Sequence, residues 1–312
     1  MKAMRRLFLR ASHSARLEAR LTRYSFVRRA VRRFMPGEDL DAALAEAERL
    51  GRAGVPTVLT LLGENARDER EVEAVVAEFR RALDEGLRRK LDAQISVKLT
   101  HLGLDLDPDL AHRSLDRLAT RAAETGSFVW IDIEGSRYTD LTLEQYRRVR
   151  RLHENVGVCL QAYLRRTAAD LEDLLSCGPA IRLVKGAYSE PPELAFPAKR
   201  DVDSNYLCLA IRVLETLGTR PAAPPRVAFG THDRRLIERI RQAADHRGID
   251  RSAYEFEMLY GIGTREGMRL AEAGYRYRVL ISYGSAWFPW YMRRLAERPA
   301  NVWFVVRSAF AR

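Results

Sequence analysis

Short apolar runs alternate with longer amphipathic stretches from residue 55 onward. The runs are rich in β-branched residues and lie at 55–62, 94–100, 128–133, 156–162, 181–187, 227–231, 254–259 and 277–283. Near-continuous apolar runs of this length are typical of parallel strands that are covered on both faces. The pattern therefore predicts eight buried parallel strands.

The stretches between these runs have the spacing of helices. One apolar face is formed by Val72, Val75, Val76, Phe79 and Leu83, and another by Leu110, Leu115, Leu118 and Ala122. Pro108 followed by Asp109 is typical of a helix start. Strand–helix alternation repeated eight times predicts an α/β fold, a (β/α)8 TIM-type barrel with N-terminal helices before it. The long connection at 188–226 is expected to hold an extra loop before its helix.

The net charge of +11 is concentrated at the N-terminus. Residues 1–36 contain eleven lysine and arginine residues and one acidic residue, Glu18, so the rest of the chain is close to neutral. We expect a basic amphipathic helical segment at 1–36 and a barrel catalytic domain at 37–312. The apolar stripe of the segment consists of Leu17, Leu21, Tyr24, Val27, Val31 and Phe34.

Two interpretations of this stripe stay open. It packs on the barrel while its arginines face water, or it lies on an anionic membrane surface. Nucleic acid is not an expected partner, because the body of the chain carries almost no net charge. The N-terminus lacks a secretory signal pattern, and the three cysteines have no metal-ligand spacing. The expected location is cytoplasmic or peripheral at the inner face of the membrane.

Polar residues gather where the predicted strands end. In a (β/α)8 barrel the active site lies at the carboxyl ends of the strands. Unpaired burial of so many polar groups would cost several kcal/mol each, so a functional mouth is expected. A metal site is not expected, since neither HxH nor HExxH occurs. The strand-end residues are Glu64, Lys98, Asp132, Glu134, Gln161, Arg182, Lys185, Thr231, His232 and Glu257.

A helix is expected after the last strand, with Pro289 in its first turn. Arg293 and Arg294 are adjacent in it and differ by about 100° around the helix axis. On a surface helix such a pair would simply be solvated. If the helix lies over the mouth, both arginines are suited to bind one carboxylate, and Glu64 is suited to pair with one of them.

Several motifs together resemble the proline dehydrogenase family, in particular its small monofunctional bacterial members. The resemblance runs from about residue 28 to residue 311. The motifs are ISVKLT (95–100), IDIEG (131–135), LQAY (160–163), IRLVKGAY (181–188), GTHD (230–233), YEFEMLYG (254–261) and YMRRLAER (291–298).

The resemblance implies an enzyme of proline catabolism with noncovalent FAD, which accepts hydride at N5 while proline becomes 1-pyrroline-5-carboxylate. It implies a quinone or another electron acceptor as the second partner. By the resemblance, Lys98, Arg293 and Arg294 bind the substrate carboxylate, and Glu64 pairs with an arginine and helps to close the site. Asp132, Ala187 and Leu259 line the pocket. The positions that match flavin contacts are Gln161, Arg182, Val184, Gly186, Thr231, His232 and Glu297.

Some pocket positions depart from the family pattern. Leu280 and Trp290 stand where the family usually has tyrosine, Glu257 where it has glutamine, and Thr60 where close relatives have aspartate. A reshaped pocket would suit a different carboxylate-bearing amine. The alternative hypothesis is therefore oxidation of a hydroxyproline, an N-substituted glycine or a hydrazino acid in a biosynthetic pathway. A barrel without flavin, acting as a binding module, is the remaining alternative.

Overall fold

The computed structural model describes residues 31–176, 178–218 and 226–297, with the backbone alone for 293–297. Eight parallel strands form a closed barrel in the order of the sequence, and β8 pairs with β1. The strands are β1 (Thr57–Leu61), β2 (Ala93–Lys98), β3 (Val129–Asp132), β4 (Val156–Gln161), β5 (Ala180–Val184), β6 (Arg226–Gly230), β7 (Tyr254–Leu259) and β8 (Arg276–Tyr283). The predicted (β/α)8 barrel is confirmed.

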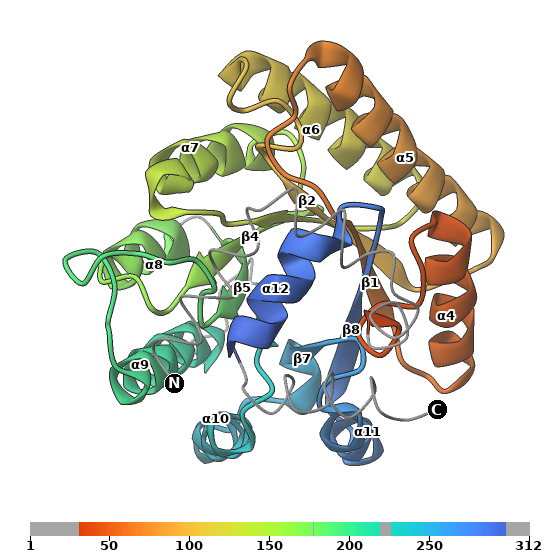
Figure 1. The fold of residues 1–312 in the computed structure, drawn as a ribbon. Helices are drawn as coiled ribbons and strands as arrows, with labels where there is room; N and C mark the ends of the chain where they lie inside the picture. The colour runs from red at the N-terminus through yellow and green to blue at the C-terminus, as the bar shows by residue number, and fades with distance from the viewer. Residues whose placement is uncertain (1–30, 177, 219–225, 298–312) are drawn as a thin grey trace, which may run out of the picture.

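Helices cover the outside of the barrel, as Figure 1 shows. They are α4 (Leu40–Arg52), α5 (Glu69–Arg88), α6 (Pro108–Glu124), α7 (Thr139–Arg150), α8 (Thr167–Leu175), α9 (Lys199–Gly218), α10 (Arg234–His246) and α11 (Thr264–Glu272). A further helix, α12 (Trp287–Glu297), follows β8. Two short 3-10 turns, Ser136–Tyr138 and Arg251–Ala253, precede α7 and β7. The extra loop expected before the helix of the long connection is confirmed, since residues 185–198 separate β5 from α9.

Local sequence signals set several helix starts. Asp107 caps α6 by accepting hydrogen bonds from the backbone of Asp109 and Leu110, and Pro108 occupies the first turn, as predicted. Asp68 caps α5 in the same way. The apolar faces predicted for these two helices are buried against the strands.

The predicted strand boundaries need small corrections. The first strand was expected to begin at residue 55, but β1 begins at Thr57, because Pro56 has no N–H to donate to a neighbouring strand. The fifth was expected to reach residue 187, but β5 ends at Val184. The chain then turns at Gly186, whose φ of +105° takes it out of the extended region.

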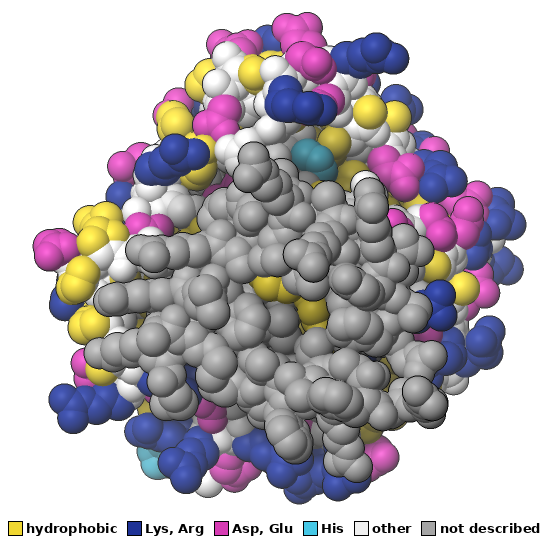
Figure 2. All heavy atoms as spheres, in the orientation of Figure 1, with side chains coloured by type: hydrophobic (Ala, Val, Ile, Leu, Met, Phe, Trp, Pro, Cys, Tyr) yellow, Lys and Arg dark blue, Asp and Glu magenta, His cyan; other side chains and the backbone are white. Residues whose placement is uncertain are grey.

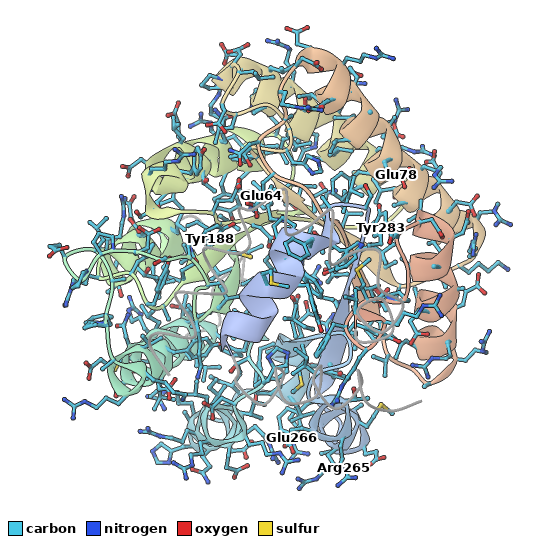
Figure 3. The ribbon with its side chains drawn as sticks, viewed as in Figure 1. Glu64, Glu78, Tyr188, Arg265, Glu266 and Tyr283 are labelled. Atoms are coloured by element: carbon cyan, nitrogen blue, oxygen red, sulfur yellow. The ribbon has the colours of Figure 1, made fainter. Side chains whose placement is uncertain are left out.

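The last helix, α12, lies across one end of the barrel (Figure 1). It follows β8 directly, so this end is the one at which the strands have their carboxyl ends. Glu64, which follows β1, and Tyr188, which follows β5, lie beside α12 at this same end (Figure 3).

A strap formed by residues 31–38 packs on α12. Val31 and Phe34, two members of the predicted apolar stripe, are buried against the aromatic residues of α12. The indole N–H of Trp287 donates to Glu38 at 3.0 Å. The other residues of that stripe, and most of the predicted segment 1–36, lie outside the described residues.

Charges of both signs are interspersed on the visible rim of helices (Figure 2). This part of the described surface therefore does not present a field of one sign. Within the described part of the chain, no helix has both the length and the apolar character to cross a membrane.

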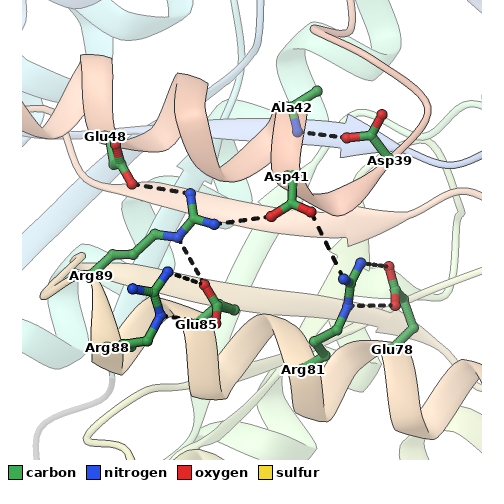
Figure 4. Close-up of polar contacts among 9 residues, drawn as sticks. All are labelled: Asp39, Asp41, Ala42, Glu48, Glu78, Arg81, Glu85, Arg88 and Arg89. Atoms are coloured by element: carbon green, nitrogen blue, oxygen red, sulfur yellow. Dashed lines mark hydrogen bonds and ion pairs between the residues drawn. The ribbon is translucent and has the colours of Figure 1, made fainter.

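Ion pairs join α4 to α5 on the outside of the barrel (Figure 4). Arg89, directly after α5, bonds Asp41 at 2.9 Å and Glu48 at 3.1 Å, both on α4, and Glu85 at 2.9 Å on α5. Its side chain is 18% exposed, whereas that of Arg88 is 65% exposed and bonds Glu85 at 2.6 Å. Arg89 therefore links two helices.

We expect Arg89→Met to lower the free energy of unfolding by about 1 kcal/mol, because exposed ion pairs contribute little singly and more in a network. Arg88→Met is the matched control and should change the free energy of unfolding much less, because among the described residues the exposed Arg88 pairs only with Glu85 of its own helix. Urea unfolding at low and high salt measures the free energy of unfolding of both variants and of wild type. The loss in Arg89→Met should be smaller in high salt, because salt screens the ion pairs. Equal losses in the two variants would contradict the role given to the network.

Candidate active site

The barrel strands alternate between apolar side chains packed against helices and side chains that fill the interior. Val97, Ile131 and Leu183 belong to the apolar cluster shared with the helices. Their neighbours along the same strands have side chains in the barrel interior. For example, Ser96 and Arg182 bond each other across the barrel. The period-2 alternation of a strand thus separates packing from chemistry.

Arg182 is the centre of the interior network. It lies on β5, is 2% exposed, and donates to Asp132 on β3 and to Glu257 on β7, the latter at 3.1 Å. It also donates to Ser96 at 2.5 Å and to the Cys159 sulfur at 2.8 Å. One guanidinium therefore ties together residues of four other strands.

The charges of this network depend on burial and pairing. Burial works against the charge of Arg182, but its neighbours raise its pKa well above the ordinary value. Burial also raises the pKa of the Cys159 thiol far above its ordinary value, so the thiol is neutral and the two carboxylates hold the guanidinium charged. For Glu257, burial raises the pKa while Arg182 acts in the opposite direction.

Glu257, which stands where the family has glutamine, is thus paired with Arg182. One of its two carboxylate oxygens, Oε1, is buried with no hydrogen-bond partner among the described residues.

Lys98 and Asp132 lie together at the rim of this network. They are register partners on β2 and β3, and each ends its strand. Lys98 is half-buried, and the carboxylate of Asp132 is 24% exposed. A cation and an anion side by side at a strand end are suited to bind a zwitterion.

Lys185, the other strand-end lysine, has different ion-pair partners. It bonds Asp203 on α9 and Asp233, the latter at 2.9 Å. The pKa of Asp233 is lowered far below its ordinary value, since Lys185 and Lys199 outweigh its burial. Lys185 is therefore a structural link between β5 and its neighbouring helices.

The ends of β4, β5 and β6 form the neighbouring sector of the mouth. Gln161 on β4 is the register partner of Val184 on β5, which in turn pairs with Gly230 on β6. Thr231 is buried, and its hydroxyl accepts the Asp233 N–H at 3.2 Å. Five residues assigned to the cofactor lie in this sector or directly after it: Gln161, Val184, Gly186, Thr231 and His232.

His232 has a defined ring orientation. Its Nε2 accepts the backbone N–H of Leu259 at 2.9 Å. In the neutral ring the hydrogen is then on Nδ1, which is a donor. The histidine thus links the end of β6 to the end of β7.

The predicted pocket residues lie around the same opening. Leu259 and Leu280 are half-buried register partners on β7 and β8. Ala187 is half-buried in the loop after β5, and Trp290 is buried on α12. The backbone of α12 carries Arg293, Arg294 and Glu297, whose side chains lie outside the described part of the structure.

Two cavities, of about 580 and 460 Å³, lie at the opposite end of the barrel. They are lined by residues near the strand starts, among them Pro56, Asp92 and Arg278. None of the site residues predicted from the sequence lines them. Among the described residues, His, Cys, Asp and Glu form no group of three that would hold a metal ion.

Comparison with known proteins identifies the family. The sequence profile of the family described as "Proline dehydrogenase" matches residues 43–307. Proline dehydrogenase 1 of Bacillus subtilis subsp. natto is 37% identical over 306 residues, covering 98% of each chain. The chain belongs to the proline dehydrogenase family. A proline dehydrogenase of Deinococcus radiodurans is 35% identical over 281 residues, covering 88% of each chain.

Solved structures support the fold of this proline dehydrogenase family member. Proline utilization A from Bdellovibrio bacteriovorus superposes with a TM-score of 0.80 at 23% identity, over 95% of this chain and 36% of that one. A variant of Bradyrhizobium japonicum proline utilization A gives 0.74 at 22% identity, over 91% and 32%. The chain thus spans about a third of the length of these larger proteins.

Proline dehydrogenases are a flavoenzyme family, and the mouth of this barrel has features that suit a flavin. A Cβ at Gly186 would lie 2.1 Å from the Tyr163 ring, so only glycine fits there, and it leaves the backbone open to close approach. Gln161, Thr231 and His232 supply hydrogen-bonding groups beside apolar Val184. This combination of hydrogen-bonding groups and an apolar side chain suits a flavin, whose large ring is apolar on its faces and polar along one edge.

The sequence pattern missed several residues that the structure adds to the mouth. In the loop after β1 the Asn65 N–H donates to the Thr100 hydroxyl at 3.1 Å, and Tyr188 donates to Glu64 at 3.4 Å. Ser96 and Cys159 contact Arg182 inside the barrel. Period-2 alternation along the strands was the available signal for Ser96 and Cys159. The loop residues had none.

Proposed function

We propose that the protein oxidises L-proline to 1-pyrroline-5-carboxylate and uses FAD as the hydride acceptor. The observation that carries this proposal is the similarity to proline dehydrogenases along 98% of the chain. Family membership makes the protein a dehydrogenase that acts on the CH–NH group. The relatives described above are named for proline, so the alternative amines are not favoured.

The substrate side of the mechanism follows from the rim of the mouth. Lys98 provides a cation for the substrate carboxylate, and Arg293 and Arg294 are proposed to complete the clamp from α12. Asp132, next to Lys98 in register, lies where an anion would attract the substrate's ring nitrogen. Fixing both ends of a small zwitterion orients the carbon that loses hydride. Glu64 is proposed to pair with one of the arginines and to close the site.

The cofactor side depends on the sector from β4 to β6. We propose that Gln161, Arg182, Val184, Gly186, Thr231, His232 and Glu297 hold FAD. When bound, FAD would accept the hydride. Arg182 would provide a fixed positive charge, since its pKa stays well above the ordinary value inside the network. Leu259 and Leu280 supply apolar surface that limits water around the substrate ring.

The electrons are proposed to leave through a quinone or another acceptor. A peripheral membrane contact through residues 1–36 and a cytoplasmic location remain predictions from the sequence.

An anaerobic visible spectrum tests the proposal. The purified protein is expected to show the yellow flavin absorption and to lose it when millimolar L-proline is added. The matched control is tetrahydrofuran-2-carboxylate, the ring-oxygen analogue, which has no amine to form an imine and should leave the flavin oxidised. A flavin that dithionite reduces but proline does not would contradict proline as the substrate. A protein that cannot bind FAD would contradict the whole proposal.

A further inference from the structure

The loop that carries Glu64 is held by a specific set of hydrogen bonds. Asn65 has a φ of +55°, a left-handed conformation that asparagine tolerates better than most residues. Its side-chain amide donates to Asp105 at 2.5 Å and to the Tyr138 hydroxyl at 3.2 Å. Gly63 has no space for a side chain, because a Cβ there would lie 2.3 Å from the His101 ring. The backbone on both sides of Glu64 is therefore fixed.

Thr100, just after β2, bonds this loop twice. Its hydroxyl oxygen accepts the backbone N–H of Asn65 at 3.1 Å. Its carbonyl oxygen accepts the N–H of Ala66 at 3.0 Å. The first bond requires that the hydroxyl direct its own hydrogen away from the loop.

Glu134, just after β3, receives that hydrogen. The Thr100 hydroxyl donates to Oε2 of Glu134 at 2.6 Å, and the Thr100 N–H donates to Oε1 at 3.1 Å. The side chain is 2% exposed. An ionised carboxylate only accepts hydrogen bonds, so it fixes the direction of both bonds. The chain of contacts therefore runs from Glu134 through Thr100 to the residue next to Glu64.

The groups around Glu134 come from three elements. Lys98 on β2 and Glu64 on the loop act on it electrostatically, and Gln161 on β4 donates to its main-chain oxygen at 2.8 Å. Burial raises the pKa of Glu134 to about 7, opposed by the Thr100 bonds and Lys98. Burial also lowers the pKa of His101, on the other side of the loop, to about 4, so that ring does not titrate near neutral pH.

We propose that Glu134, acting through Thr100, is a positioning residue that holds Glu64 at the barrel mouth in the arrangement that substrate binding requires. The inference rests on the proposed function, which gives Glu64 its role in closing the site. When Glu134 takes up a proton, its carboxyl group becomes a donor and the Thr100 hydroxyl loses its acceptor. The hold on the loop then weakens.

A ligand without an amine makes the test specific. Tetrahydrofuran-2-carboxylate keeps the ring and the carboxylate of proline but has no group that titrates between pH 6 and pH 8. Its affinity for the full-length, FAD-loaded protein is measured by calorimetry across this range. The wild-type protein is expected to bind it roughly fivefold more tightly at pH 8 than at pH 6, a modest coupling between two sites.

Glu134→Gln is the decisive variant. A glutamine amide presents a donor to one of the two Thr100 groups that the carboxylate accepted. The variant is expected to bind the analogue roughly fivefold more weakly than wild type at pH 8, with little dependence on pH. The KM for proline should rise by a similar factor, with a smaller change in kcat, because chemistry at the ring is not altered.

Two variants of Thr100 provide the matched pair. Thr100→Ser keeps the hydroxyl and should retain the affinity and the pH dependence of the wild type. Thr100→Val keeps the shape without the hydroxyl and should resemble Glu134→Gln. If Glu134 and Thr100 had only a structural role, Glu134→Gln and Thr100→Val would instead lower the melting temperature and leave the pH dependence of analogue binding unchanged.

Stability distinguishes positioning from unfolding. The pKa of Glu134 is raised in the folded state, so its contribution to stability is present below about pH 4.5 and is lost as pH rises through about 7. Glu134→Gln should therefore not lower the melting temperature at pH 8.

If Glu134→Gln binds the analogue as wild type does, with the same pH dependence, the inference is overturned and the proposed function stands. If wild type neither binds the analogue nor oxidises proline, the proposed function fails, and the inference with it.

Discussion

Arg182→Met is expected to lower the free energy of unfolding by about 3–5 kcal/mol, because breaking a buried ion pair leaves an uncompensated charge. Arg182 is 2% exposed and bonds two carboxylates, those of Asp132 and Glu257. Methionine fills a similar volume but donates no hydrogen bond. The loss should exceed that of any surface ion pair in this protein.

The size of the loss depends on how the two acids respond. Asp132 is 24% exposed and can gain water, whereas Glu257 is 3% exposed and cannot. Burial already raises the pKa of Glu257 against the effect of Arg182. Without the guanidinium, which lowers it, the pKa of Glu257 should rise further. The folded-state pKa of Glu257 in the variant would then lie further above its unfolded-state pKa. The variant should therefore lose stability as pH rises from the unfolded-state pKa through the folded-state pKa.

The double variant Arg182→Met with Glu257→Met is the control for this argument. Removing both charges avoids the unpaired acid, so it should recover at least half of the lost stability. Urea unfolding at fixed FAD concentration measures all three proteins, since bound cofactor shifts the apparent stability. A loss below about 1 kcal/mol in Arg182→Met, or no recovery in the double variant, would contradict the central role of the network.

The barrel was predictable because its signals are local. Eight apolar runs, each separated by an amphipathic stretch, gave the number and order of the strands. The Asp107–Pro108 start of α6 is a matter of capping chemistry within a few residues. The predicted strand boundaries were wrong by a few residues where two local signals disagree. Pro56 extends an apolar run, but it has no N–H to donate to a neighbouring strand.

The contacts inside the barrel were not predictable in the same way. Arg182 and Glu257 are 75 residues apart, and Thr100 and Glu134 are 34 apart. Their meeting depends on strand register and barrel closure, which no pattern along one strand contains. The sequence predicted Glu257 at a strand end, as an acid where the family has glutamine. Only the folded barrel, in which β6 lies between β5 and β7, shows that Arg182 bonds it.

The loop after β1 shows a further limit. Glu64 was predicted as a site residue from its place after the first strand and from the resemblance, while the residues that hold its loop were not. Asn65, Thr100 and Tyr138 come from three separate segments and meet only in the folded chain. Hydroxyls and amides of this kind are common in loops, so their types alone predict turns rather than a site.

Lys98→Met is expected to reduce kcat/KM for proline by roughly 10- to 100-fold, the equivalent of losing one hydrogen bond to a charged group. The side chain ends β2 in register with Asp132, half-buried at the mouth. Without the ammonium group, only the two arginines proposed to complete the clamp, Arg293 and Arg294, would bind the substrate carboxylate. Most of the effect should be in KM, because the ammonium group is proposed to bind the carboxylate, a part of the substrate that does not react.

Lys185→Met is the matched control, because it also removes a strand-end lysine. That ammonium group bonds Asp203 and Asp233, so its loss should affect stability rather than kcat/KM. Rapid anaerobic mixing with proline, followed through the flavin absorbance, separates binding from hydride transfer in both variants. Equal losses of kcat/KM would mean that the two lysines act only through the general charge of the mouth. A Lys98→Met variant with wild-type KM would contradict the carboxylate clamp, and the anion in the Lys98–Asp132 pair would then be the group that orients the substrate.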